Sequence, residues 1–268
     1  MKSDSKMKKD VIENIEDGTV GKALYILELI SEFDTPQRFS DIQKCSPFPK
    51  ASTYRLVTTL LNQRMLVLDE RTARYSMGGR LIKLASKAWK NTSLGPIAAP
   101  YIDKLSVATG QTIHLAKLDN GQVLYLDKRN ANRPIPMFSD AGKVAPVYCT
   151  GVGKAMLAFS KQGDIQRIIA QQSFYRFTEH TIISGDALLQ ELENIRNEGC
   201  AYDREEHETG IICLAVPIVA DSGLAVAGLS VTLSTRQYSL EDLASFRAEL
   251  EQTAKEISKA AGDWLLNH

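Results

Sequence analysis

The sequence predicts an α+β fold with two parts, an N-terminal winged helix-turn-helix and a C-terminal α/β domain. Short helical patterns around a Pro-rich turn, followed by a hairpin pattern, predict the first part. Strands that alternate with helices beyond residue 96 predict the second part. The polar segment 91–96, which contains Gly and Pro, separates them. We therefore place a winged helix-turn-helix at 17–80, a helix and linker at 81–95, and a second domain at 96–268.

The composition is that of a folded globular protein. The chain has 268 residues, of which 44% are hydrophobic and 24% are charged, and this is enough for one large domain or two smaller ones. The polar start and the lack of a run of about 20 apolar residues favour a cytoplasmic protein with no membrane partner.

No metal and no cofactor is expected. The four cysteines include no C-x-x-C pair, so we expect small buried groups rather than a disulfide framework or a zinc site. His207 lies in the run EEHE without a second histidine at ligand spacing, so a solvated acidic turn is expected there.

The first helices follow from local patterns. Apolar residues at helical spacing predict a packed helix over 19–33. A short second helix over 38–45, with Ser40 as its N-cap, ends at the turn Pro47-Phe48-Pro49, which also begins a third helix.

The third helix, within FPKASTYRLVTTLL, has two unlike faces. Leu56, Val57, Leu60 and Leu61 form an apolar stripe, whereas the opposite face presents hydroxyls, a methyl group and Arg55 but no acid. A solvated helix normally carries Glu and Lys there, and acids would repel DNA phosphates in a major groove. The pattern favours a recognition helix over the alternative, a solvated helix that happens to lack acids.

A hairpin over 65–68 and 74–77 has basic residues at its tip, as a DNA-binding wing requires. Residues 36–90 carry 11 Lys and Arg against 3 Asp and Glu, although the chain as a whole has a formal net charge of zero. A basic module joined to an acidic remainder indicates contact with a polyanion. We expect double-stranded operator DNA as the partner, read by Lys50, Ala51, Ser52, Tyr54, Arg55, Thr58, Arg71 and Arg74.

A helix over 80–90 has a continuous apolar side formed by Leu81, Leu84, Ala85 and Ala88. This is more apolar surface than one winged domain buries, so we expect part of it to pack on a second subunit in a homodimer or homotetramer. Packing against the second domain of the same chain is the alternative.

The second domain is predicted from helices and strands in alternation. The expected elements are a helix at 97–109, a hairpin of 112–118 with 123–127, a strand at 133–139, helices from 151 and over 188–197, strands at 212–219 and 224–233, and a final helix from about 240 to the end.

The stretch Gly151-Val152-Gly153-Lys154 begins a predicted helix and superficially resembles a phosphate loop. That motif needs a glycine and a hydroxyl where the chain has Tyr148 and Ala155, and a dinucleotide fingerprint needs a third glycine where it has Met156. Two readings stay open: a site for a small anion such as a carboxylate, and a tight turn that lets the helix pack. No nucleophile or acid–base set has a recognisable context, so no catalytic residue is assigned.

Several stretches in this order resemble the isocitrate-lyase-regulator (IclR) family of bacterial transcriptional regulators over about 19–262. They are PKASTYRLV, RYSMGGRLIKLA, TGQTIHLAKLDNGQVLYLDK, APVYCTGVGKAMLAF, FTEHTII, IRNEGCAYDREEHETGIICLAVPI and AGLSVTLS. The resemblance implies a winged helix-turn-helix, a GAF-like effector-binding domain at 96–268, and dimers or tetramers on operator DNA. It also implies control of catabolic genes in response to a small organic or aromatic acid. An enzyme of small-acid metabolism and a DNA-free sensor of such acids are the alternatives.

The resemblance further implies an effector pocket lined by Met137, Ala145, Gly151, Val152, Asp203, Cys213, Ser230 and Thr232. A ligand carboxylate at the helix start would repel Asp203. We therefore expect Asp203 at the opposite end of the pocket, accepting a hydrogen bond from a ligand hydroxyl or from backbone N–H groups. Two positions depart from the family pattern: Val219-Ala220 after the signature strand, and Ala51, where many relatives have serine. The effector, the operator sequence and the direction of regulation stay open.

Overall fold

A computed structural model describes residues 18–92 and 94–262 of the chain. The chain forms two compact units, which divide between residues 92 and 93. Within the described residues, no helix is long and apolar enough to cross a membrane.

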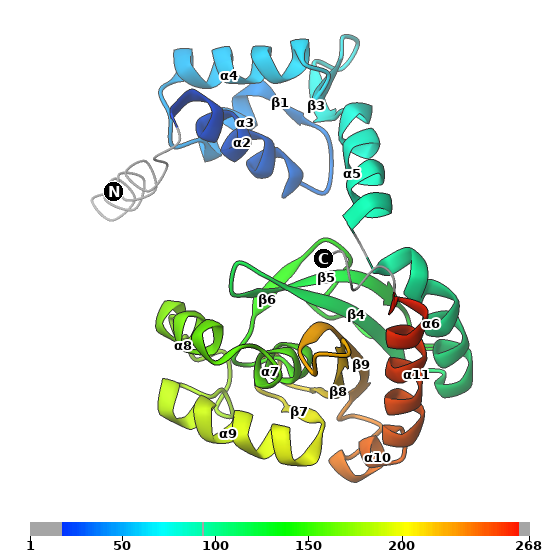
Figure 1. The fold of residues 1–268 in the computed structure, drawn as a ribbon. Coiled ribbons are helices and arrows are strands. Elements are labelled where there is room, and N and C mark those ends of the chain that lie inside the picture. The colour runs from blue at the N-terminus through cyan, green and yellow to red at the C-terminus, as the bar shows by residue number, and fades with distance from the viewer. Residues whose placement is uncertain (1–17, 93, 263–268) are drawn as a thin grey trace. The chain divides into compact units, whose positions relative to one another are not determined.

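The first unit combines helices with a three-stranded antiparallel sheet (Figure 1). Its elements are α2 (Gly18–Ser31), β1 (Gln37–Arg38), α3 (Phe39–Cys45), α4 (Lys50–Asn62), β2 (Leu66–Asp69), β3 (Arg74–Met77) and α5 (Gly79–Thr92). The strand order is β1-β3-β2, in which β2 and β3 form the predicted hairpin and β1 adds an edge strand that the sequence did not predict. Helices α3 and α4, joined by a tight turn, give the predicted helix-turn-helix.

A single apolar core from α2, α3, α4 and β2 holds this unit together. The turn of the helix-turn-helix is fixed by the buried Thr53, whose hydroxyl lies 2.8 Å from Ser46 Oγ. The prediction of Ser40 as N-cap of α3 is wrong. The helix begins at Phe39, and Arg38 precedes it in an extended conformation because it pairs with β3.

The second unit is a six-stranded antiparallel sheet with helices on both faces (Figure 1). Its elements are α6 (Gly95–Thr109), β4 (Thr112–Asp119), β5 (Gln122–Arg129), β6 (Val144–Pro146), α7 (Gly151–Ala158), α8 (Gln162–Gln171), α9 (Gly185–Glu198), β7 (Ala201–Arg204), β8 (Ile211–Val219), β9 (Ala225–Ser234), α10 (Leu240–Ala244) and α11 (Arg247–Ala260). The strand order is β6-β5-β4-β9-β8-β7, so segments distant in sequence meet in the centre.

Each face of this sheet has its own apolar core. Helices α6, α10 and α11 cover one face, and α7, α8 and α9 cover the other. Successive residues of a strand point to opposite faces, so Ile212 and Leu214 of β8 enter the first core and Ala215 enters the second. The candidate site lies on the α7 face.

Three features of the second unit differ from the sequence prediction. The strand predicted at 133–139 is wrong: Pro134 and Pro136 have no N–H to donate to a ladder, and β6 forms later in the chain instead. The final helix is interrupted at 245–246, and the predicted stretch 263–268 lies outside the described residues. Helix α8 and strand β7 were not predicted.

Candidate functional site

Helix α4 presents the surface predicted to read DNA. Thr53, Leu56, Val57 and Leu60 form its buried side. The predicted reading residues lie elsewhere on the helix; they are the exposed Lys50, Ala51, Tyr54 and Arg55 and the half-buried Ser52 and Thr58. The ring of Tyr54 packs edge-to-face on Phe39 with 5.5 Å between centroids, which holds it beside the exposed face.

The two wing arginines differ in their surroundings. The Asp69 carboxylate closes the β2–β3 turn by accepting the backbone N–H groups of Arg71, at 2.9 Å, and Thr72, at 3.3 Å. This leaves the side chain of Arg71 exposed at the tip. Arg74 Nη1 instead donates to the Pro36 carbonyl at 2.7 Å, so this guanidinium braces its own domain.

The sheet register brings the predicted pocket residues together. Asp203 on β7 lies opposite Cys213 on β8, and Cys213 lies opposite Thr232 on β9. In the next row of the same face, Ser230 on β9 lies between Ala215 and His114. Residues almost 120 positions apart in the chain therefore share one patch of the α7 face, since side chains of one row point the same way.

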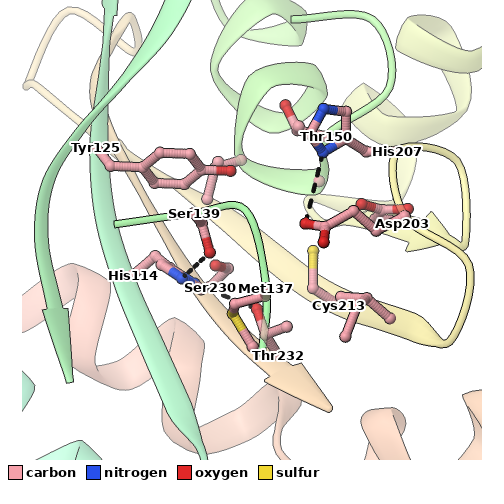
Figure 2. Close-up of a pocket in the computed structure, with 14 residues that line it drawn as sticks. His114, Tyr125, Met137, Ser139, Thr150, Asp203, His207, Cys213, Ser230 and Thr232 are labelled. Carbon is pink, nitrogen blue, oxygen red and sulfur yellow. Dashed lines mark hydrogen bonds and ion pairs between the residues drawn. The ribbon is translucent and has the colours of Figure 1, made fainter. Parts of the chain in front are cut away.

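A cavity of about 30 Å³ lies between these strands, the start of α7 and the irregular segment that precedes β6 (Figure 2). Seven of the eight predicted pocket residues line it: Met137, Gly151, Val152, Asp203, Cys213, Ser230 and Thr232. The eighth, Ala145, is not in the lining. It is buried in the neighbouring core, opposite Val123 on the β5–β6 ladder.

Other residues line the cavity that the sequence did not predict: His114, Tyr125, Ser139, Thr150, His207, Glu208 and Ile211. The expectation that His207 lies in a solvated turn is wrong. Its ring is mostly buried and packs on Phe177, with 4.8 Å between centroids, and on Phe138, with 5.5 Å. His114 did leave a signal, since it is a polar residue at an inward position of an otherwise apolar strand.

Glycines at the start of α7 are required by close packing. A Cβ at Gly151 would lie 2.5 Å from Cys213 Sγ, and a Cβ at Gly153 would lie 2.6 Å from the Val147 carbonyl oxygen. Burial, then the neighbouring Asp203 carboxyl, raises the pKa of the Cys213 thiol, although the Gly151 N–H, which hydrogen-bonds the sulfur, opposes this. Thr150, the N-cap, gives no side-chain cap to the helix.

Asp203 lies beside the helix start, because its backbone nitrogen is 3.5 Å from a Cβ placed at Gly151. The expectation that it stands at the opposite end of the pocket is therefore wrong. Its carboxylate does accept a backbone hydrogen bond, from the Glu206 N–H at 2.8 Å. Burial, followed by the nearby Glu206 carboxyl, raises the pKa of Asp203 to about 8, so this carboxyl is largely protonated at neutral pH.

A buried ion cluster supports this corner of the site. Lys154 of α7 is fully buried, and its Nζ donates to Glu206 Oε1 at 2.6 Å and to Glu191 Oε1 at 3.1 Å. Burial raises the pKa of Glu206 even though Lys154 opposes the shift. Burial also acts to raise the pKa of Glu191, but Lys154 and Arg204 outweigh this effect, so the pKa of Glu191 is lowered. The cluster thus connects α7, α9 and the turn after β7.

The segment around Met137 and Ser139, which we call the roof of the cavity, is held by polar contacts (Figure 2). His114 Nε2 lies 2.8 Å from Ser139 Oγ, and its Nδ1 lies 3.2 Å from Thr232 Oγ1. Burial, helped by the charge of Lys128, lowers the pKa of His114 to about 3, so the ring is neutral. The Glu208 carboxylate accepts the Phe138 N–H at 3.0 Å. Ser139 and its neighbours are therefore fastened over the cavity without regular secondary structure.

Comparison with known proteins identifies the family of both units. Residues 86–259 match the bacterial transcriptional regulator IclR C-terminal domain, and residues 19–70 match the IclR helix-turn-helix domain. The chain is 33% identical over 213 residues to the HTH-type transcriptional regulator KdgR of Escherichia coli K12, covering 80% of this chain and 81% of KdgR.

Solved structures show the same architecture. Thermotoga maritima IclR is 30% identical with a TM-score of 0.76, covering 91% of this chain and 98% of that one. An IclR homologue from Microbacterium hydrocarbonoxydans, complexed with 4-hydroxybenzoate, is 21% identical with a TM-score of 0.77 and the same coverage. The predicted fold and the predicted kind of function are confirmed. The chain belongs to the IclR family of bacterial transcriptional regulators, with an N-terminal DNA-binding helix-turn-helix and a C-terminal domain for a small-molecule ligand.

Proposed function

We propose that this regulator reads a two-fold-symmetric operator through α4 and the wing, and that a small carboxylic acid in the cavity beside α7 changes its affinity for that operator. The observation that carries the proposal is the convergence of Asp203, Cys213, Ser230 and Thr232 on one cavity at the start of a helix. Such a helix start favours anions, and the cavity wall offers hydroxyls next to apolar surface.

The charge of the cavity wall suits an acid. His114 is neutral and Asp203 is largely protonated near pH 7, so a bound carboxylate does not face a full negative charge from that aspartate. The protonated carboxyl can itself donate a hydrogen bond. Glu208 is the acid left in the lining, and its carboxylate is engaged with the Phe138 N–H.

The size of the cavity sets a condition on the ligand. A volume of about 30 Å³ is room for very few atoms, so a larger acid requires the roof around Met137 and Ser139 to move outward. The Microbacterium homologue holds 4-hydroxybenzoate, a ring acid with a second polar group. We extend the class to this chain as small organic or aromatic acids, bound in a domain of GAF-like topology and not turned over.

On the DNA side, the proposal assigns base or phosphate contacts to the predicted residues of α4 and to Arg71. Arg55 lies at the centre of the acid-free exposed face, where a guanidinium can contact guanine O6 and N7. Because one recognition helix covers few base pairs, two copies of the chain are needed for a half-site pair about 34 Å apart. We place the subunit contact on the apolar side of α5.

The DNA half of the proposal is tested by titrating a fluorescent duplex, selected from random sequence by the parent protein. Arg55→Ala should weaken binding about 5-fold to 150-fold, equivalent to about 1–3 kcal/mol, if the contact is bidentate. Arg167→Ala removes the same charge from the exposed surface of α8 in the other unit and serves as the matched control. Equal affinities of the two variants would remove Arg55 from the reading surface.

A further inference from the structure

Tyr125 brings a hydroxyl to the cavity that the hydrogen bonds of the described residues do not use. Tyr125 of β5 is 7% exposed, and its ring reaches into the cavity (Figure 2). Three of the other hydroxyls around it are occupied: Ser139 and Thr232 bond the His114 ring, and Thr150 Oγ1 donates to the Pro146 carbonyl. The shorter Ser230 side chain, like Tyr125, makes no side-chain hydrogen bond within the described residues. Within the described part of the chain, the Tyr125 hydroxyl has no protein hydrogen-bond partner.

Alternation along β5 directs this side chain to the cavity, since Val123 and Tyr125 both belong to the core on the α7 face. On the β4–β5 ladder Leu115 pairs with Asp127 and Ala116 pairs with Tyr125, so Leu126 is an extra residue on β5. Tyr125 lies on the α7 face, as does Lys128, which donates to the Ser139 carbonyl at 2.6 Å. Strict alternation would place residues three apart on opposite faces. The bulge thus brings Lys128 to the same face as Tyr125, where Lys128 holds the Ser139 backbone beside the cavity that the phenol enters.

The surroundings make the phenol a donor. Its ring packs on His114 at 5.2 Å between centroids, and Cys213, Asp203 and Glu208 line the same cavity. Burial, followed by the effect of these acidic groups, raises the pKa of Tyr125, which excludes the phenolate near neutral pH. The protein leaves this largely buried donor unpaired, so a ligand that brings an acceptor gains a hydrogen bond there.

We propose that Tyr125 determines which acids act as effectors: its hydroxyl donates a hydrogen bond to a second oxygen of the bound acid, selecting hydroxy or oxo acids over acids that lack this oxygen. The inference rests on the proposed function, since it assumes that carboxylic acids bind in this cavity. Its physical basis is that a site built to pair with a polar ligand group rejects the analogue without that group, because its own buried donor is left unpaired.

The test uses two matched pairs of acids, lactate with propionate and 4-hydroxybenzoate with benzoate, and isothermal titration calorimetry on the full-length protein. We expect the parent to bind the oxygen-bearing member of at least one pair about tenfold or more tightly, which corresponds to about 1.4 kcal/mol. Tyr125→Phe keeps the ring and should reduce that ratio to about one. Tyr175→Phe alters an exposed tyrosine and should keep the parent ratio. Thermal unfolding of Tyr125→Phe checks that the fold is intact.

The outcomes distinguish a failure of the Tyr125 role from a failure of the proposed acid site. If the parent binds acids but shows no preference within either pair, or if Tyr125→Phe keeps the preference, the role of Tyr125 is wrong and the acid site stands. If Tyr125→Phe weakens both members of a pair equally, the hydroxyl contacts the carboxylate itself and the specificity role is likewise wrong. If no acid of the four binds the parent, the proposed effector class fails and this inference fails with it.

Discussion

Replacing Asp203 by asparagine should change how the stability of the second unit depends on pH. Asp203 is 6% exposed and its carboxyl accepts the Glu206 N–H, and burial raises the pKa of this carboxyl to about 8 from an ordinary value of 3.8. The substitution Asp203→Asn keeps an acceptor oxygen for that N–H while removing the ionisation.

The sign and size of the effect follow from proton linkage. A carboxyl whose pKa is raised on folding stabilises the fold fully below pH 3.8, and this contribution is lost as pH rises through about 8. Between these limits each pH unit lowers the free energy of unfolding by about 1.4 kcal/mol. From pH 5 to pH 8 the parent should therefore lose up to about 4 kcal/mol relative to Asp203→Asn.

Urea unfolding followed by circular dichroism at several pH values between about 5 and 8.5 measures this difference. Asp221→Asn, in the exposed turn between β8 and β9, is the matched control for loss of a carboxyl. Glu206 and Lys154 are present in parent and variant, so their own titration cancels to first order. Parallel stability curves for the parent and Asp203→Asn would refute the view that Asp203 carries a proton in the folded protein.

Two further outcomes are expected. Lys154→Met should lower the free energy of unfolding by about 3–5 kcal/mol in urea titrations, because it leaves the buried Glu206 carboxylate without its cation. Adding Glu206→Gln to this variant should recover part of the lost stability. An equal loss of stability in the double variant would contradict this explanation. Leu84→Asp, on the half-exposed apolar side of α5, should shift the parent oligomer to monomer in sedimentation velocity at micromolar concentration, whereas Ser86→Asp on the other side should not. A parent protein that is monomeric in this experiment would contradict a subunit contact on α5.

Local patterns were enough to predict most of the first unit. Helix α4 and the β2–β3 hairpin depend on apolar spacing and turn residues within a few positions of each other, which a single sequence displays directly. Strand β1 was not predicted, because two residues are too few to show the alternation of a strand. The capping of α3 was mispredicted because the pairing of Arg38 with β3, a contact distant in sequence, fixes where the helix begins.

The candidate site was predictable only in part. The family resemblance indicated Asp203, Cys213, Ser230 and Thr232, and the register of β7, β8 and β9 places them in adjacent rows. Tyr125 was missed because the family resemblance did not indicate it, and its alternation with Val123 shows only that it faces the α7 core. The position of Asp203 was mispredicted because its carboxylate was taken as ionised, whereas burial favours the protonated form.

The central claim is that an acid in the cavity acts on DNA binding through the rest of the protein, and operator titrations with and without acid test it most directly. Fluorescence anisotropy of the selected duplex would be measured for the parent, for Ser230→Ala in the cavity wall, and for Ser222→Ala in an exposed turn as control. We expect saturating effector acid to change the operator affinity of the parent and of Ser222→Ala by about 5-fold to 150-fold. Ser230→Ala should bind the duplex as the parent does without acid and lose most of the shift. A full shift in Ser230→Ala, or no shift in the parent with any of the four acids, would contradict the claim.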